Sequence, residues 1–198
     1  MMAQMDLLKT ALSFDDILLI PRYSEIQTRK EIKIEQELKK IRSEPFTLPI
    51  IASPMDTISG VDMARAVSEC GGVAIIHRYN SIEEQAAMVM DVINTGHTVG
   101  AAIGVGDDCI ERAKALVRVG VSFLCIDVAH GHHAKVRYAL QVLKNTFGDE
   151  VHLMAGNVAT LEAFNDLADW GADSIRVGIG GGSICSTRIQ TGHGLPGL

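Results

Sequence analysis

From residue 48 onward, short apolar runs alternate with amphipathic segments. Each of the first five apolar runs is followed by a segment of helical spacing that ends at or near a glycine. Ser81 and Glu84 have the spacing of a capping box, and Thr160 is expected to be an N-cap. This alternation predicts a parallel sheet with crossover helices. The six predicted strands are 48–55, 71–77, 98–104, 122–129, 151–157 and 173–180.

Polar residues and glycines gather where these predicted strands end. Examples are Ser53, Asp127, Asn157 and the glycines at 178 and 180. Loops at the carboxyl ends of strands build the active site of a (β/α)₈ TIM barrel. A doubly wound sheet would carry its glycine loop after the first strand, whereas here it follows the sixth. We therefore predict an α/β fold of the barrel type.

A complete barrel needs eight strands and usually about 250 residues. The 198 residues supply about six strands, so we expect the N-terminal portion of a barrel, with two strand–helix units beyond Leu198. The alternative is a half-open sheet of six strands, which would leave two unpaired edges. Residues 1–47 lack the strand–helix rhythm and are predicted to form an N-terminal extension and hairpin that pack on the barrel domain, residues 48–198.

Composition narrows the class of protein. The hydrophobic fraction of 47% and the charged fraction of 21% are typical of soluble globular proteins, and the net charge of −6 argues against nucleic-acid binding. The start of the chain shows no secretory signal, and no apolar run reaches the roughly 18 residues of a membrane span. Neither a nucleic acid nor a membrane is therefore an expected partner.

The four cysteines fit a reducing compartment, and we expect a cytoplasmic protein. None lies in a CxxC pair, which argues against a zinc ribbon or a thioredoxin-like site. Cys70, Cys109 and Cys125 lie in apolar, periodic surroundings and are expected to be buried free thiols.

Cys185 differs because it lies in the glycine-rich run GIGGGSICSTR, residues 178–188. Backbone amides around Gly182, with the Ser183 hydroxyl, suit a phosphate group. Open amides and Arg188 would favour a thiolate, and a thiolate can attack an electrophilic carbon. From spacing alone, a flexible turn with an inert thiol remains an equal alternative.

Two other groups of residues bear on the chemistry. Asp127 and Asn157 end buried strands, so we interpret both as ligand-binding residues. His130, His132 and His133 lie close together in the sequence, but no carboxylate-rich segment accompanies them. We interpret them as the start of a helix rather than a metal site.

Several motifs, in order along the chain, resemble the IMP dehydrogenase and GMP reductase family. The run GIGGGSICSTRIQTGHGLP is similar to the family's cysteine loop. The segments SFDDILLIPRYSEI, IIASPMDTISGVDMA, GGVAIIHRYNSIEEQ, GAAIGVG, IDVAHGHH and MAGNVAT also have counterparts. The resemblance covers roughly residues 12 to 197 and implies an oxidoreductase that acts on a purine mononucleotide.

The resemblance also implies roles for individual residues. Cys185 corresponds to the nucleophile that attacks C2 of the purine, and Thr187 to a hydroxyl that assists the water or ammonia chemistry. Asp127 corresponds to the carboxylate that meets the ribose of a nicotinamide cofactor. Residues implied in substrate binding are Ser53, Met55, Asn157, Arg176, Gly182 and Ser183. The carbonyls of Gly180, Gly182 and Cys185 correspond to ligands of a potassium ion, and family members are usually homotetramers.

Some sequence features resemble those of the dehydrogenases, and others resemble those of the reductases. Dehydrogenases usually carry a pair of CBS modules between the second helix and the third strand, and here that link is the short run Asn94-Thr95-Gly96. Its shortness and the Thr191-Gly192 pair are reductase features, whereas SPMDT, IHRYNSIEEQ and VGAAIGVG are closer to the dehydrogenases. We favour NAD-dependent oxidation of IMP to XMP. NADPH-dependent reduction of GMP to IMP is the alternative, and a non-catalytic nucleotide-binding fragment is the second.

A different phosphate-binding barrel, such as an aldolase, is disfavoured. Its chemistry would require a catalytic lysine at a strand end, and no predicted strand here ends on a lysine.

Overall fold

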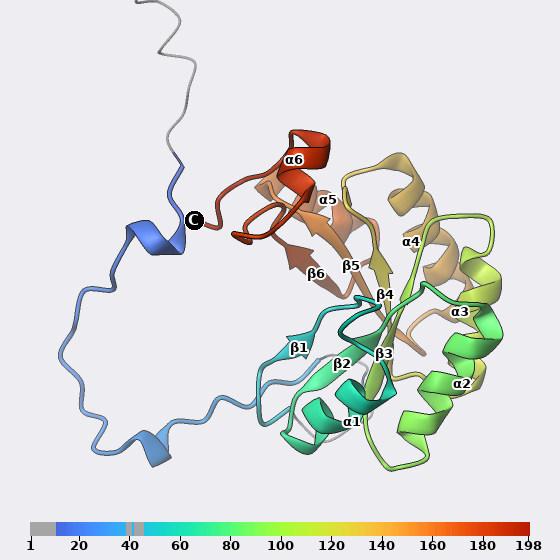
Figure 1. Cartoon of the computed structure of the whole chain (residues 1–198), viewed down its shortest axis with the longest axis horizontal. Helices are drawn as coiled ribbons and strands as arrows, with labels where there is room; N and C mark the ends of the chain where they lie inside the picture. The colour runs from blue at the N-terminus through green and yellow to red at the C-terminus, as the bar shows by residue number, and fades with distance from the viewer. Residues whose placement is uncertain (1–10, 39–40, 42–45) are drawn as a thin grey trace, which may run out of the picture.

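The computed structural model of the chain describes residues 11–38, 41 and 46–198. Its strands lie parallel and in sequential order in one six-stranded sheet (Figure 1). This confirms the prediction of the first six strands of a (β/α)₈ barrel. Residues 1–10, 39–40 and 42–45, which belong to the predicted N-terminal extension, lie outside the described residues, and the prediction about a secretory signal falls on the first of these ranges. The strands are β1 (Ile51–Ala52), β2 (Val73–Ile76), β3 (Val99–Ile103), β4 (Phe123–Asp127), β5 (His152–Val158) and β6 (Ser174–Val177).

Five helices alternate with these strands and cover the outer face of the sheet (Figure 1). The predicted caps are confirmed. The Ser81 hydroxyl accepts from the Glu84 amide at 3.1 Å, and the Thr160 hydroxyl accepts from the Ala163 amide at 3.2 Å. A sixth, short helix follows β6. The helices are α1 (Val61–Glu69), α2 (Ile82–Ile93), α3 (Cys109–Arg118), α4 (Ala134–Phe147), α5 (Leu161–Asp169) and α6 (Thr187–Thr191).

The strands are buried on both faces, which explains why they read as continuous apolar runs. Alternate residues such as Ala74 and Ile76 pack in the larger hydrophobic cluster together with helical residues. The intervening Val73 and Ile75 belong to a second cluster, on the face of the sheet that becomes the inside of the barrel. Its buried members are Phe46, Val73, Ile75, Ala102, Phe123, Cys125 and Met154.

A layer of large side chains fills the inside of the barrel below the strand ends. Gly100 pairs with Phe123 in the register of β3 and β4, and a Cβ on Gly100 would lie 2.3 Å from the Phe123 ring. The glycine therefore makes room for the ring. His152 makes a T-shaped contact with the same ring, and its Nε2 lies 2.8 Å from the Ser174 hydroxyl. The residues at the strand ends therefore lie above a layer of closely packed side chains.

A buried polar cluster joins α2 to α3. The Gln85 amide donates to the carbonyls of Ile76 and Ala102, at 3.3 and 2.8 Å. The Arg112 guanidinium donates to Gln85 Oε1 at 3.0 Å and to Asp108 at 2.9 Å. These bonds compensate the cost of burying the guanidinium and hold α2 and α3 against the ends of β2 and β3.

The N-terminal segment departs from the compact part of the chain. Gln36 and Phe46 form an antiparallel bridge, and Phe46 is buried against the sheet. Residues 11–35 extend away from the sheet in Figure 1, and Leu18 is 93% exposed. The packing of residues 1–47 on the barrel and the domain boundary at residue 47 stay predictions.

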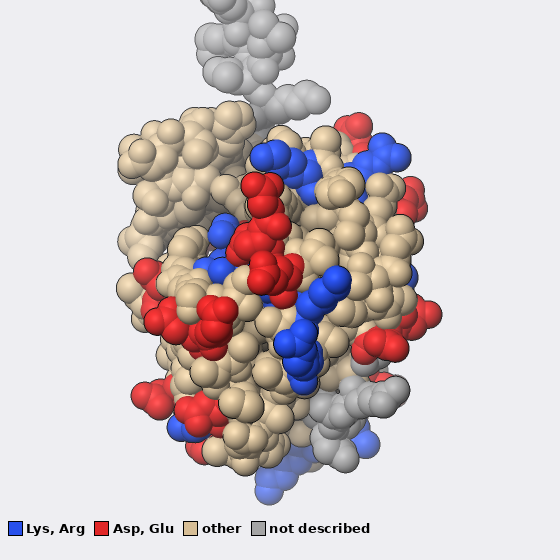
Figure 2. Space-filling model, turned by 90° about the vertical axis from the view of Figure 1, so that its right-hand side faces the viewer, with Lys and Arg blue, Asp and Glu red and all other residues tan. Residues whose placement is uncertain are grey.

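The distribution of charge and the character of the helices also bear on the presence of a binding surface or a membrane span. Figure 2 shows both acidic and basic side chains on the helical face of the molecule. Within the described residues, no helix combines the length and apolar character that crossing a bilayer requires.

Candidate active site

A row of three residues crosses the ends of the last three strands. Asp127 on β4 pairs in register with Gly156 on β5, and Gly156 pairs with Arg176 on β6. Because side chains alternate along a strand, register partners such as these share one face of the sheet. The Arg176 guanidinium donates to the Asp127 carboxylate across β5, and the two side chains are 22% and 21% exposed. The middle position is open because Gly156 has no side chain, and a Cβ there would lie 2.6 Å from Arg176 Cβ.

Cys125 lies one step below Asp127 on the same face of β4. Its sulfur lies 3.8 Å from Nη1 of Arg176. Burial raises the pKa of the Cys125 thiol to about 12, so the thiol is neutral near pH 7. Cys125 is therefore a packing residue beneath the ion pair rather than a nucleophile.

Asn157 joins the ends of β5 and β6. Its side-chain amide donates to the Gly178 carbonyl at 2.9 Å, and its own carbonyl accepts from the Gly131 amide at 2.7 Å. The residue thus holds the loop after β4 and the start of the cysteine loop against β5. Its amide oxygen is left to accept a hydrogen bond from a ligand.

The cysteine loop runs from the end of β6 to Leu195 and folds back on itself. The Leu195 amide donates to the Ile179 carbonyl at 3.0 Å and closes the loop at its base. The short helix α6 interrupts the loop and ends at Gly192, which has a left-handed φ of 69°. Sequence patterns missed this helix. The sequence signal that could have revealed the end of this helix is Gly192, because glycine often follows the last residue of a helix.

Cys185 lies two residues before the start of α6 and is partly exposed. The Thr187 side chain has the largest effect on its pKa, which it lowers by hydrogen bonding to the sulfur. The Thr187 and Arg188 backbone amides and the Arg188 charge lower the pKa further. All these groups stabilise the thiolate, the form that reacts as a nucleophile.

The loop glycines were predicted to serve two ligands. Gly182 and Ser183 are exposed on the loop. The Gly182 carbonyl accepts from the Cys185 amide at 3.0 Å and from the Arg188 guanidinium at 3.3 Å. As arranged, this carbonyl faces a cationic side chain, which does not fit a potassium ligand. The set Gly180, Gly182 and Cys185 as potassium ligands stays a prediction.

Ser53 and Met55 follow β1, at the same end of the sheet. Both are exposed, and the Ser53 carbonyl accepts hydrogen bonds from the Met55 amide and the Ser59 hydroxyl. β1 and β6 are the two outer strands of the sheet, so these residues lie on the far side of the barrel mouth from the cysteine loop. Within the described residues, no hydrogen bond joins them to the other predicted site residues.

The structure also bears on the other three cysteines and on metal binding. Cys109 and Cys125 are buried, but Cys70, which follows the last residue of α1, is exposed. The prediction that Cys70 is buried was therefore wrong. In the described part of the chain, no group of three or more His, Cys, Asp or Glu side chains could hold a metal ion.

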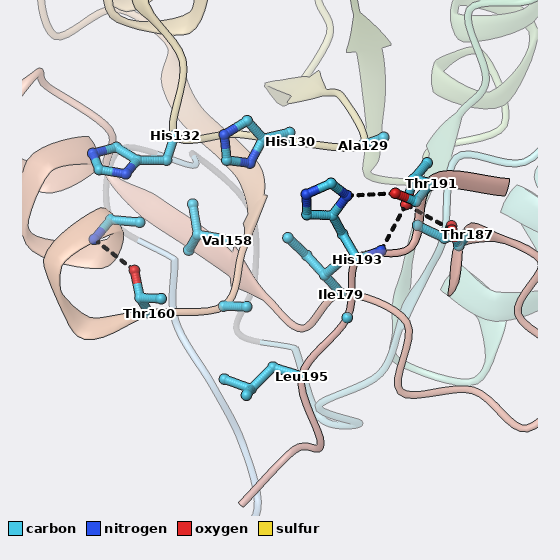
Figure 3. A pocket seen from close by; sticks show the side chains of 13 residues that line it. Ala129, His130, His132, Val158, Thr160, Ile179, Thr187, Thr191, His193 and Leu195 are labelled. Atoms are coloured by element: carbon cyan, nitrogen blue, oxygen red, sulfur yellow. Dashed lines mark hydrogen bonds between the residues drawn. The ribbon is translucent and has the colours of Figure 1, made fainter. Parts of the chain in front are cut away.

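A pocket that the sequence did not predict lies beside the cysteine loop (Figure 3). Its volume is about 550 Å³, and Thr187 is one of its lining residues. Three imidazoles from two loops also line it: His130, His132 and His193. The sequence drew attention to His130 and His132, but not to their approach to His193, because the sheet register rather than sequence spacing brings these loops together.

Residues 11–198 match the sequence profile of the IMP dehydrogenase / GMP reductase domain. The chain belongs to this family. It is 37% identical to an inosine-5′-monophosphate dehydrogenase of Cryptosporidium parvum, an alignment that covers 93% of the chain and 55% of the relative. It is 35% identical to the Borreliella burgdorferi dehydrogenase, over 95% of the chain and 58% of the relative.

A GMP reductase of Vibrio vulnificus is 32% identical over 94% of the chain and 55% of the relative. The chain thus spans a little over half the length of these curated relatives. Membership in the IMP dehydrogenase / GMP reductase family makes the chain part of an oxidoreductase family named for purine mononucleotides. The names divide between the two reactions, as the sequence motifs do.

Proposed function

We propose that this chain carries the nucleophile and the nucleotide site of an enzyme that oxidises IMP to XMP with NAD. One observation carries the proposal: at the same end of the barrel, a thiol with a lowered pKa accompanies a strand-end carboxylate. The thiol is Cys185 and the carboxylate is Asp127. A nucleophile and a polar anchor are the two protein groups that this chemistry requires.

Cys185 acts first in the proposed reaction. Its thiolate attacks C2 of the purine, forming a carbon–sulfur bond, and a hydride leaves C2. NAD, when bound, supplies the acceptor for this hydride. Water then adds at C2, the carbon–sulfur bond breaks, and the sulfur returns as the thiolate. Thr187 contacts the sulfur and is suited to assist the water step.

The remaining residues bind and orient the substrate and cofactor. Asp127 uses one carboxylate oxygen for Arg176, and no further hydrogen bond of its side chain is found within the described residues. Its second oxygen is therefore suited to accept from a ribose hydroxyl of the cofactor. Arg176 keeps this carboxylate in place. Asn157, Ser53, Met55, Gly182 and Ser183 are the proposed substrate-binding residues, and the loop amides near Gly182 would meet the phosphate.

GMP reduction with NADPH is the second candidate, and one observation favours it. Helix α2 ends at Ile93 and β3 begins at Val99, so only residues 94–98 join them. This link is too short to contain an inserted domain such as a pair of CBS modules. Both reactions use Cys185 in the same covalent role, and they differ in whether hydride leaves C2 or arrives there as ammonia leaves. A nucleotide-binding protein without turnover is the third possibility.

Two features of the whole protein belong to the same proposal. A nucleophilic thiol needs a reducing environment, and the cytoplasm supplies one. The family resemblance implies a homotetramer.

The test compares two reactions in the same assay. The protein is incubated with IMP and NAD, and separately with GMP and NADPH, while the absorbance of the reduced nicotinamide is followed. The Cys185→Ala variant is the control. A rise with IMP that is absent in the variant supports the dehydrogenase, and a fall with GMP supports the reductase. No change in either direction with folded protein would reject both enzymatic proposals.

A further inference from the structure

The loop that joins β1 to α1 carries two of the proposed substrate-binding residues, Ser53 and Met55. β1 is two residues long and lies at the edge of the sheet, and within the described residues β2 is its one neighbour (Figure 1). The register of β1 therefore fixes the backbone only as far as Ala52, which pairs with Ala74. Other contacts must hold Ser53 and Met55 in place.

Most of this loop is exposed, and its two buried residues lie near its ends. Ser53, Met55 and the turn at 56–58 are exposed. Pro54 and Ser59 are buried, and Ser59 is completely so. Serine is seldom buried to this extent, and a buried hydroxyl needs a hydrogen-bond partner. The partner of the Ser59 hydroxyl therefore shows what holds the loop.

That partner is the Ser53 carbonyl, six positions earlier in the chain. The Met55 amide donates to the same carbonyl at 2.8 Å and closes a tight turn around Pro54. A carbonyl oxygen has two lone pairs, so both bonds form together. The Ser59 amide also donates to the Met55 carbonyl at 2.9 Å. Ser59 thus bonds to the backbones of both residues that are proposed to contact the substrate.

Ser59 also connects the loop to the interior of the protein. Its carbonyl accepts from the His77 amide at 3.4 Å, directly after the end of β2. The next residue, Gly60, is the N-cap of α1. Ala64 on α1 and Ile76 on β2 are both buried in the larger hydrophobic cluster. One buried serine therefore ties an exposed loop to two elements that the core holds fixed.

We propose that Ser59 is a positioning residue for the purine nucleotide. Because it is completely buried, it does not reach the substrate itself. Its hydroxyl holds the Ser53 carbonyl, and this bond fixes the backbone from which the Ser53 and Met55 side chains extend. Without the bond, nucleotide binding would carry the entropic cost of ordering the loop. The inference rests on the proposed function, which assigns Ser53 and Met55 to the substrate.

Two substitutions at this position separate the hydrogen bond from packing. Ser59→Ala removes the hydroxyl, and Ser59→Cys keeps a side chain of similar shape with only a weak donor. Isothermal titration calorimetry gives the dissociation constants of IMP and GMP. Both variants should bind the preferred nucleotide about three- to tenfold more weakly, because one hydrogen bond is lost. In the turnover assay, KM should rise by the same factor while kcat stays near that of the wild type.

Ser122→Ala is the matched control at the opposite end of the strands. Ser122 is partly buried and precedes β4, and its hydroxyl accepts from the Val99 amide at 3.3 Å. The same substitution there removes another hydrogen bond between a side chain and the backbone, but it should leave nucleotide binding unchanged. A general loss of stability would instead affect both alanine variants alike.

Amide hydrogen exchange tests the loop without any ligand. Three amides of the loop donate within it, to the carbonyls of Ser53 and Met55. In peptides that cover residues 53–60, exchange should be faster in Ser59→Ala than in the wild type, because the turn opens more often. The Ser122 variant should exchange these amides at the wild-type rate.

Three outcomes would overturn the proposal. Equal exchange in the wild type and Ser59→Ala would show that the hydroxyl does not hold the loop. Faster exchange with an unchanged dissociation constant would show that the order of the loop does not affect binding. Wild-type affinity in Ser59→Cys would assign the effect to packing.

Failure of the proposed function gives a different result. A wild-type protein that binds neither IMP nor GMP would reject that function and, with it, the role of Ser59 in substrate binding. Faster exchange in Ser59→Ala would then still show that Ser59 holds the loop.

Discussion

Two regions at the mouth of the barrel hold their functional groups by different means. Asp127 and Arg176 lie on strands, about four-fifths buried, and meet because the register of three strands places them on one face. Cys185 lies on a loop with exposed neighbours, and residues within three positions along the chain set the pKa of its thiol. The first region is positioned by the whole sheet and the second by local hydrogen bonds.

This difference separates binding geometry from reactivity. A change in the sheet should alter stability and ligand position together, because the ion pair is part of the packed interior. A change in the loop should alter the thiol with little effect on stability, because exposed sites rarely contribute much. Substitutions in each region therefore distinguish the two kinds of control.

The largest effect is expected from Asp127→Ala. This change leaves the Arg176 guanidinium mostly buried without its carboxylate, which should lower the free energy of unfolding by about 3 kcal/mol. Urea denaturation monitored by circular dichroism measures it. The Asp127→Ala/Arg176→Met double variant should recover much of the loss, because no unpaired charge then remains. An equal loss in the single and double variants would show that the pair contributes by packing alone.

A smaller effect is expected from Gly156→Ala, the position between the two partners. The added Cβ would lie 2.6 Å from Arg176 Cβ and 2.7 Å from its carbonyl oxygen, so the strand must shift. Overpacking of this kind costs about 1–3 kcal/mol. Gly181→Ala is the matched control in the cysteine loop, because a Cβ there has no neighbour within 4 Å. Equal stabilities of the two variants would contradict the proposed contrast between strand and loop.

The same contrast explains what the sequence predicted. The strands and the caps at Ser81 and Thr160 depend on local periodicity, and they were confirmed. The polar strand ends at Asp127 and Asn157 were visible for the same reason. The contact between Asp127 and Arg176 was not, because their positions are 49 apart in the chain and only the register joins them.

Local sequence patterns did not predict features that depend on the three-dimensional surroundings of a residue. Cys70 has apolar neighbours in the sequence, yet it lies just beyond a helix end and faces solvent. Nothing in the sequence singled out His193, because its position in the pocket wall depends on the loops after β4 and β5. Helix α6 is only five residues long, too short for a periodic signal.

Thr187→Val should change the thiol more than the fold. Losing the hydroxyl that bonds the Cys185 sulfur should raise the pKa of the thiol and slow alkylation by iodoacetamide roughly 3- to 10-fold at pH 7. The difference should shrink at higher pH, where both thiols are ionised. The measurement needs a Cys70→Ser background, because Cys70 is also exposed.

Thr191→Val is the control for this change in the same short helix. Its hydroxyl donates to the Thr187 carbonyl at 2.7 Å and does not contact the sulfur. Its alkylation rate should match that of the background protein. If Thr191→Val slows the reaction as much as Thr187→Val, the effect arises from the helix and not from the hydrogen bond to sulfur.

Arg188→Gln is expected to have the smallest effect and tests how local the control of reactivity is. The Arg188 charge lowers the pKa of Cys185, but less than the Thr187 hydrogen bonds do. Alkylation at pH 7 should therefore slow by about twofold at low salt. Because both groups are in contact with solvent, about 1 M salt should screen their interaction and remove the difference. A slowing that persists at high salt would mean that Arg188 acts through its hydrogen bond to the Gly182 carbonyl, holding the loop, rather than through its charge.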